Sequence, residues 1–169
     1  AFLLTPHFYE ANPQRNQNWL EANFRVGLYN AGFIGVSQQG MEILDWWADC
    51  CLYNVKKSFW RGLFDDQKYL DLVPVLFDHV EIVRHKGCNL AGWNYRNYVL
   101  SGDNDQLLVN GDPLVFIHFA TLSMQEFSSR HHTLNAPYET YLAALKTHKP
   151  DFKWVHSKLE ARNLASFFY

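Results

Sequence analysis

The amino-acid sequence predicts a mixed α/β fold in which helices flank a sheet, and three observations predict it. Residues 28–36, LYNAGFIGV, form an uncharged and mostly apolar run, which is typical of a strand buried on both faces in a largely parallel sheet. Residues 38–56 repeat apolar side chains at helical spacing, and residues 80–85 alternate in character as a strand does.

Composition excludes several classes of protein. The chain has 169 residues and a net charge of −2, and because it has no basic run we expect no nucleic-acid partner. It has no stretch of 18 apolar residues, so no membrane span is expected. The spacing of Cys50, Cys51 and Cys88 fits neither a zinc site nor a redox pair, which favours reduced thiols and a cytoplasmic location.

The first expected strand, Phe2–Leu4, begins almost at the first residue of a chain that lacks an initiator Met. We therefore expect the chain to be part of a longer protein. Pro6 removes a hydrogen-bond donor and should end the strand. His7 is expected to lie at the surface or cap a turn, and the alternative is that it faces a site. Residues 11–24 are polar and predict a loop or a weak helix.

Asn30 is the polar side chain within the LYNAGFIGV run. A buried carboxamide left without partners costs about 1–3 kcal/mol, so Asn30 should bind either the protein backbone or a ligand at the strand edge. Gly32 and Gly35 weaken a strand unless another group comes close to the backbone there. That group could be a ligand or the next helix.

The helix expected over 38–56 has Ser37 as its N-cap and ends near Lys56 and Lys57, which favour the helix dipole. Trp46 and Trp47 are expected in the core, and the alternative is that they form a platform for a ligand.

Three polar residues, Asp65, Asp66 and Gln67, begin a helical pattern that we expect to stop at Pro74. One carboxylate can cap the first turn, and both are favoured by the helix dipole. We assign the cap to Asp65, which leaves Asp66 and Gln67 to face a cleft. The alternative is that all three are ordinary first-turn residues.

A glycine-punctuated loop follows the strand predicted at 80–85 and carries Asn89, Trp93 and Asn94. Binding residues concentrate on loops held by a rigid sheet, so these side chains could bind hydroxyl groups. The alternative is that the asparagines satisfy the backbone of the turn.

Asn110-Gly111 lies between two apolar runs and predicts a hairpin whose second strand covers 113–119. His118, near the end of that strand, is either a hydrogen-bonded core histidine or a metal ligand. Residues 120–134 are polar and predict irregular structure. Asn135 and Pro137 predict the start of a helix that stops before Pro150, and residues 154–169 are expected to be helical.

In these segments the chain resembles the C-terminal half of a GT-A-type bacterial glycosyltransferase of the nucleotide-diphospho-sugar transferase superfamily, with a distant likeness to glycogenin-like enzymes. The segments occur in the same order over about residues 3–120: LTPH at 4–7, YNAGFIGV at 29–36, LDWWAD at 44–49, LFDDQKYLDLVP at 63–74, NLAGWN at 89–94 and PLVFIHF at 113–119. The resemblance implies a partial GT-A-like mixed sheet with flanking helices. It divides the chain into an acceptor-side part, 1–120, and a helical C-terminal extension, 121–169.

The resemblance also implies roles for single residues. Asp66 would be the catalytic carboxylate, able to steady oxocarbenium-like charge or to act as a base. His118 would help to hold Mn²⁺ or Mg²⁺ in the full-length protein, where the metal stabilises the leaving diphosphate. Contacts to the sugar or the acceptor would come from Asn30, Asp65, Gln67, Asn89, Trp93 and Asn94.

The expected function is transfer of a sugar from a nucleotide-diphospho-sugar to a saccharide or lipid-linked acceptor, in glycan or polysaccharide synthesis. The chain by itself is expected to be inactive. The alternative is a non-catalytic carbohydrate-binding or scaffold domain on a degenerate glycosyltransferase fold. Two departures support that alternative: no Asp-x-Asp pair precedes LTPH, and Ala120-Thr121 stand where the family has a Ser-Gly type of turn.

Overall fold

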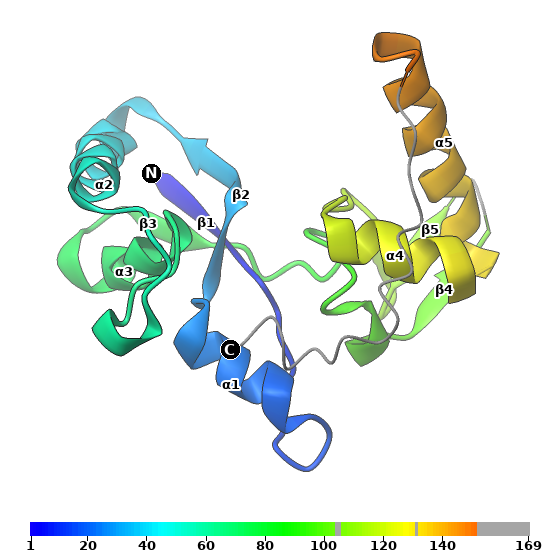
Figure 1. The fold of residues 1–169 in the computed structure, drawn as a ribbon, viewed down its shortest axis with the longest axis horizontal. Helices are drawn as coiled ribbons and strands as arrows, with labels where there is room; N and C mark the ends of the chain where they lie inside the picture. Colours follow the sequence, from blue (N-terminus) through cyan, green and yellow to red (C-terminus); the bar gives the residue numbers. More distant parts are fainter. Residues whose placement is uncertain (104–105, 131, 152–169) are drawn as a thin grey trace.

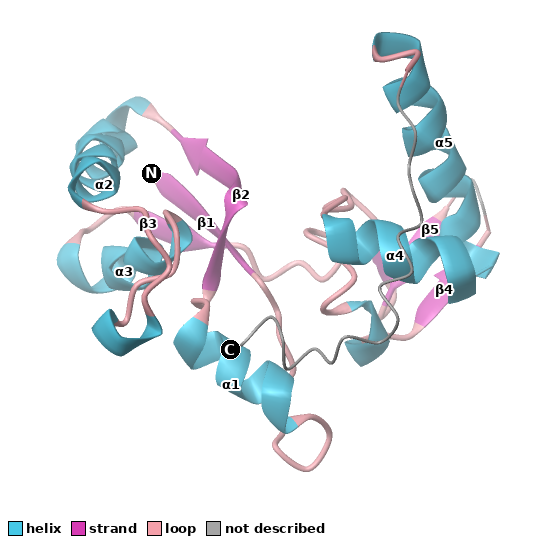
Figure 2. Cartoon of the chain, in the orientation of Figure 1, coloured by secondary structure: helices cyan, strands magenta, loops and turns pink. Residues whose placement is uncertain are grey.

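The computed structural model describes residues 1–103, 106–130 and 132–151. Within these residues the chain forms two three-stranded sheets and five α-helices (Figure 1 and Figure 2). The predicted mixed α/β class is confirmed. None of the helices in the described ranges is both long enough and apolar enough to cross a membrane.

The first sheet has β1 (Phe2–Pro6) at its centre, between β2 (Tyr29–Val36) and β3 (Val80–Ile82). β1 pairs antiparallel with β2 and parallel with β3. The prediction of a strand buried on both faces in a largely parallel sheet is wrong for β2. It is an antiparallel edge strand, and such a strand can leave side chains such as Phe33 in contact with water.

Helix α2 (Met41–Tyr53) follows a single 3₁₀ turn, η1 (Gln38–Gly40), so the helix predicted over 38–56 is confirmed apart from its last turn. It packs on the first sheet through the fully buried Ile43. Ser37 does not cap it; its hydroxyl oxygen instead accepts a hydrogen bond from the amino group of Ala1.

A 3₁₀ helix, η3 (Gln67–Leu72), runs directly into α3 (Val73–Leu76). Pro74 therefore lies in the first turn of α3, where its missing N–H costs little, and does not stop the pattern. The cap predicted for Asp65 is wrong. Its backbone has a φ of 47°, and its carboxylate pairs with Lys57 Nζ at 3.2 Å instead of capping η3.

The second sheet contains β4 (Leu100–Gly102), β5 (Leu107–Val109) and β6 (Asp112–Pro113). The predicted Asn110-Gly111 hairpin is confirmed, and both turn residues have positive φ, as a type I′ turn requires.

The strand predicted over 113–119 is much shorter than expected. After β6 the chain leaves the sheet, because the N–H groups of Val115 and Phe116 donate to Gly87 O and that of His118 donates to Leu90 O. These bonds lay residues 115–118 along the loop that begins at residue 87.

Two helices, α4 (Thr121–Arg130) and α5 (His132–His148), complete the described chain. The irregular structure predicted for 120–134 is wrong, because Met124 and Phe127, three residues apart, bury one face of α4. α5 begins before Asn135, so Pro137 lies inside it. The helix predicted over 154–169 lies outside the described residues.

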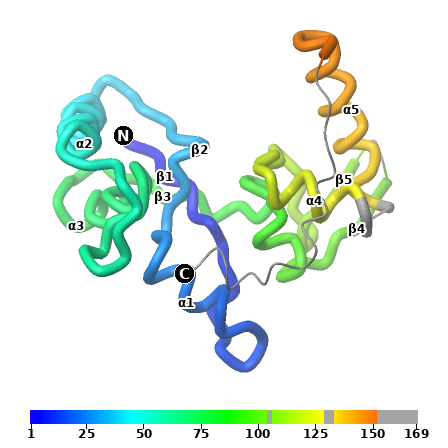
Figure 3. The backbone as a smooth tube through the Cα atoms, viewed as in Figure 1, coloured from blue at the N-terminus to red at the C-terminus, as the bar shows by residue number. Residues whose placement is uncertain are grey.

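The tube in Figure 3 shows two parts side by side. One holds β1–β3 with α2 and α3, and the other holds β4 and β5 with α4 and α5. Helices α4 and α5 complete the core of the second part, whose fully or nearly fully buried side chains are Leu90, Tyr95, Leu107, Val109, Met124, Phe127, Leu134 and Tyr138.

Three asparagine amides fasten the two parts together. The Nδ2 groups of Asn89, Asn94 and Asn97 donate to three successive carbonyls, those of residues 6, 7 and 8, at 2.9, 2.8 and 3.2 Å. The segment that leaves β1 is therefore held between the first sheet and the loop of the second part.

Candidate functional site

A cavity of about 290 Å³ lies at this junction, and we call it the junction cavity. Both parts of the molecule line it, with His7, Tyr9, Trp19, Val26, Asn30, Lys57, Phe64, Gln67, Trp93, His118, Ala120, Thr121 and Leu122. Four of these side chains were predicted as site residues: Asn30, Gln67, Trp93 and His118. They come from four separate segments of the sequence.

Asn30 fixes the orientation of His118. Asn30 is only 4% exposed, and its Oδ1 accepts a hydrogen bond from the N–H of Gly32 at 2.6 Å. Its amide nitrogen consequently faces Nδ1 of His118 at 3.4 Å. Because an amide nitrogen only donates, Nδ1 must accept, and the proton of the neutral imidazole lies on Nε2. The hydrogen-bond partners of the Asn30 side chain are therefore the backbone N–H of Gly32 and the imidazole of His118.

Gly32 allows this arrangement. A Cβ atom at Gly32 would lie 2.3 Å from Cε1 of His118 and 2.7 Å from Oδ1 of Asn30. Position 32 therefore needs a glycine because the imidazole of His118 comes close to the backbone there. At the other strand glycine, Gly35, a Cβ atom would come nearest to the Leu3 side chain, at 3.1 Å.

Aromatic rings form one wall of the cavity. His7 stacks on Tyr9 with ring centroids 4.6 Å apart, and Tyr9 stacks on Trp19 at 5.2 Å. Trp93 meets the rings of His7 and His118 edge-on, at 5.7 and 5.0 Å. Such rings offer a broad apolar surface with polar atoms at its margin.

The two imidazoles of the cavity are uncharged at neutral pH. Burial lowers the pKa of His7 to about 4, and burial also lowers the pKa of His118. Nδ1 of His7 lies 3.0 Å from the carbonyl oxygen of Gly27 and donates to it. Among the described residues of the lining, Lys57 is the one with a charged side chain, and its ammonium group pairs with Asp65.

His7 should make stability depend on pH. Between its ordinary pKa of 6.5 and its folded value of about 4, the unfolded chain takes up a proton that the folded chain does not. The free energy of unfolding therefore falls as the pH drops below 6.5, by about 3 kcal/mol in all once the pH reaches 4. The free energy of unfolding, measured with urea at several values between pH 7 and pH 4, should fall more steeply with decreasing pH for the natural chain than for His7→Asn. Equal slopes would contradict this assignment.

Asp66 is not part of the lining, although its neighbour Gln67 is. The backbone carbonyl of Asp66 accepts a hydrogen bond from Trp47 Nε1 at 2.8 Å. Burial raises the pKa of the Cys51 thiol, and the negative charge of the Asp66 carboxylate raises it further. The expected convergence is therefore found for Asn30, Gln67 and His118 but not for Asp66. Adjacent residues of a tight turn point in different directions.

Asn89 and Asn94 support the site instead of contacting the cavity. Both are fully buried, and neither belongs to the lining. Asn94 accepts from the N–H of Ala91 at 2.9 Å and donates to the carbonyls of His7 and Asn89 at 2.8 Å. The positions of Asn89 and Asn94 therefore match the alternative prediction, in which the loop asparagines form hydrogen bonds with backbone groups.

A divalent cation would need several side chains with oxygen, nitrogen or sulfur ligands gathered at one point. Among the described residues, no three His, Cys, Asp or Glu side chains gather as a metal ion would require. Nδ1 of His118 faces Asn30, and none of the described residues that line the cavity beside it is a carboxylate. The described residues do not by themselves complete such a site.

Sequence reasoning missed two residues of the aromatic wall and favoured the wrong position for a third. The surface position favoured for His7 is wrong, because His7 is 3% exposed and lines the cavity, as the alternative had it. Tyr9 and Trp19 fall in or near a polar stretch, where α1 (Gln17–Arg25) forms with Asn16 as its N-cap, accepting from the N–H of Trp19 at 3.1 Å. A lone Trp in a polar stretch was the signal that could have indicated Trp19.

Comparison with known proteins finds relatives without a described activity. No protein-family model matches the chain, and no solved structure matches it. The chain is similar to the uncharacterized protein YfnF of Bacillus subtilis (strain 168), 34% identical over 114 residues, which cover 64% of this chain and 38% of YfnF. It is also 27% identical over 124 residues to the uncharacterized protein YfnD of the same organism, covering 71% of this chain and 40% of YfnD. The chain thus spans about two fifths of the length of the curated relatives it matches.

Proposed function

We propose that this chain forms the acceptor-side part of a GT-A-like glycosyltransferase, which moves a sugar from a nucleotide-diphospho-sugar to a saccharide or lipid-linked acceptor. The observation that carries the proposal is the convergence of Asn30, Gln67, Trp93 and His118 on one cavity. The resemblance had singled out these four residues as sugar, acceptor or metal contacts, and they are far apart in the sequence.

The chemistry of the junction cavity suits an uncharged, hydroxylated group. His118 presents an N–H at Nε2, and the buried imidazoles carry no charge near pH 7. A hydroxyl group can both donate and accept, so it can pair with neutral amide and imidazole groups. The aromatic wall would cover the C–H face of a sugar ring.

Two parts of the proposed mechanism need groups beyond the cavity lining. The role of Asp66 as the catalytic carboxylate stays a prediction, because Asp66 does not line the cavity. A Mn²⁺ or Mg²⁺ ion would stabilise the leaving diphosphate, and it would need oxygen ligands other than those of the junction cavity. This chain's own contribution is to bind and orient the sugar hydroxyls.

The test uses the natural protein that carries this chain, at its full length. With Mn²⁺ and a panel of nucleotide-diphospho-sugars, it should release nucleoside diphosphate, and His118→Ala or Asn30→Ala should lower the rate about a hundredfold. His148→Ala is the matched control, because His148 is exposed at the end of α5. Release at the natural rate by both cavity variants would contradict the proposal.

A carbohydrate-binding domain without transferase activity is the second candidate. It is favoured by the position of Asp66 outside the lining and by the absence of a three-residue metal cluster among the described side chains. Calorimetry separates the two candidates. Saccharide binding that is indifferent to nucleotide and to Mn²⁺ would favour the binding domain.

A further inference from the structure

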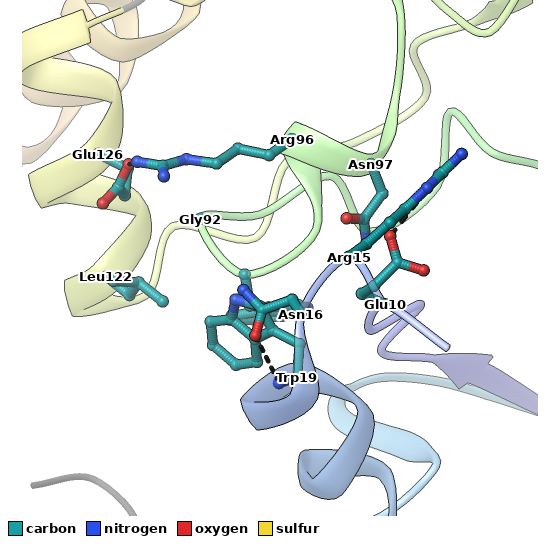
Figure 4. A pocket seen from close by; sticks show the side chains of 10 residues that line it. Glu10, Arg15, Asn16, Trp19, Gly92, Arg96, Asn97, Leu122 and Glu126 are labelled. Atoms are coloured by element: carbon teal, nitrogen blue, oxygen red, sulfur yellow. Dashed lines mark hydrogen bonds and ion pairs between the residues drawn. The ribbon is translucent and has the colours of Figure 1, made fainter. Parts of the chain in front are cut away.

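A second cavity, of about 430 Å³, adjoins the junction cavity and shares Trp19, Trp93 and Leu122 with it. Figure 4 shows it between the loop at Gly92, the beginning of α1 and the first turns of α4. Nothing in the sequence pattern indicated it, because its walls come from three distant segments.

Two ion pairs line this second cavity, and we call it the paired-charge cavity. Arg96 lies 2.6 Å from the Oε2 atom of Glu126, and Arg15 lies 3.7 Å from the Oε2 atom of Glu10. The four charges sum to zero. The arginine side chains are 59% and 71% exposed, whereas those of the glutamates are 21% and 12% exposed.

Other groups already hold the glutamates in place. Tyr95 Oη donates to Oε2 of Glu126 at 2.6 Å, and Nε of Arg96 donates to Tyr95 Oη at 2.9 Å. Oε1 of Glu10 accepts the N–H groups of Ala11 and Asn12, both at 2.9 Å. A guanidinium has five N–H donors, so the exposed arginines keep donors that can point toward a ligand.

We propose that the paired-charge cavity binds a second, uncharged sugar unit, so that the saccharide ligand is a neutral oligosaccharide of at least two units. One unit lies in the junction cavity, and its neighbour lies in the paired-charge cavity. The inference rests on the proposed function and specifies its acceptor.

The pairing of charges selects a neutral unit. A hydroxyl group donates one hydrogen bond and accepts two, so it can bridge an arginine and its glutamate while the pair stays intact. A carboxylate or phosphate on the ligand would meet the glutamate beside each arginine and would be repelled by that more buried carboxylate.

The shared tryptophans favour one continuous ligand. Trp19 and Trp93 border both cavities, so a chain of sugar rings can pass from one to the other along aromatic surface. With volumes of about 290 and 430 Å³, the two cavities lie near the lower end of the range for small-ligand sites. Each therefore suits a group the size of one sugar unit.

The experiment measures saccharide affinity by calorimetry on the full-length protein. The probes are glucose, galactose, mannose and N-acetylglucosamine, their homodisaccharides, and glucuronic acid and glucose 6-phosphate as anionic probes. At least one neutral disaccharide should have a dissociation constant about tenfold lower than that of its monosaccharide.

The gain should depend on the paired charges. In Arg96→Gln, and independently in Arg15→Gln, the disaccharide and its monosaccharide should bind alike, with thermal unfolding confirming that each variant is folded. Arg25→Gln is the matched control and should keep the gain, because Arg25 forms an exposed ion pair with Glu21 on α1 and lines neither cavity.

Three results would overturn the inference, and they differ in what they leave standing. Monosaccharide binding with no disaccharide gain refutes the second sugar site but leaves the proposed function intact. Tighter binding of glucuronic acid or glucose 6-phosphate, lost in Arg96→Gln, shows an anion site instead. No binding of any saccharide refutes the inference and the proposed function together.

Discussion

Replacing Gly32 with alanine is expected to lower both saccharide affinity and donor turnover of the full-length protein about a hundredfold, because a misplacement of about 1 Å at a binding site can cost that much. The added Cβ would lie 2.3 Å from Cε1 of His118, so the imidazole has to move. It would then lose its contact with Asn30 and aim its Nε2–H elsewhere. Calorimetry measures the affinity, and the ring signals of His118 in an NMR spectrum report the displacement.

Gly35→Ala is the control for this prediction. It lies on the same strand, and a Cβ atom there would lie 3.1 Å from Cβ of Leu3 on the paired strand and would not meet His118 or Asn30 first, so saccharide affinity should stay at its natural value. The double variant Gly32→Ala/His118→Ala removes the clash with the imidazole and keeps the 2.7 Å approach to Oδ1 of Asn30, so Gly32→Ala should cost less stability in the His118→Ala background than in the natural chain. Natural affinity in Gly32→Ala would show that His118 takes no part in binding.

Asn94→Ala is expected to lower the free energy of unfolding by about 2–4 kcal/mol, since each buried polar group left without a partner costs about 1–3 kcal/mol. The substitution removes three hydrogen bonds, and it takes the Asn94 partner away from the buried N–H of Ala91 and from the carbonyl of Asn89. Urea unfolding at pH 7 measures the loss.

The control is Asn18→Ala, an exposed asparagine on α1, which should change stability by less than about 0.5 kcal/mol. The two roles considered for Asn94 give opposite results. A ligand-binding asparagine would lose saccharide affinity with little change in stability, and that outcome would refute the structural role.

The fold was predictable where periodicity carries the signal. The apolar spacing of α2 and the Asn110-Gly111 turn correctly predicted a helix and a hairpin. The same signal misjudged β2, because an apolar run does not tell which strands pair with it or whether both faces are covered. It missed α4, because Met124 and Phe127 anchor that helix while most of its other residues are polar.

The candidate site was predictable in part. The resemblance indicated Asn30, Gln67, Trp93 and His118, and these four line one cavity. It also indicated Asp66, which lies beside Gln67 in the sequence but not in the cavity. The direction of a side chain at the start of a 3₁₀ helix depends on how that helix docks, and no sequence motif records it.

By itself, the sequence determined the α/β class, the positions of most strands and helices, and a set of polar residues suited to binding hydroxyl groups. The tertiary structure alone decided that β2 is an edge strand, that Asn89 and Asn94 are supports, and that His7, Tyr9 and Trp19 form an aromatic wall next to a second, paired-charge cavity. The physical reason is that both cavities lie at a junction held by hydrogen bonds between residues 83 to 89 positions apart. Periodicity and turn signals act over a few residues, so they do not encode that docking.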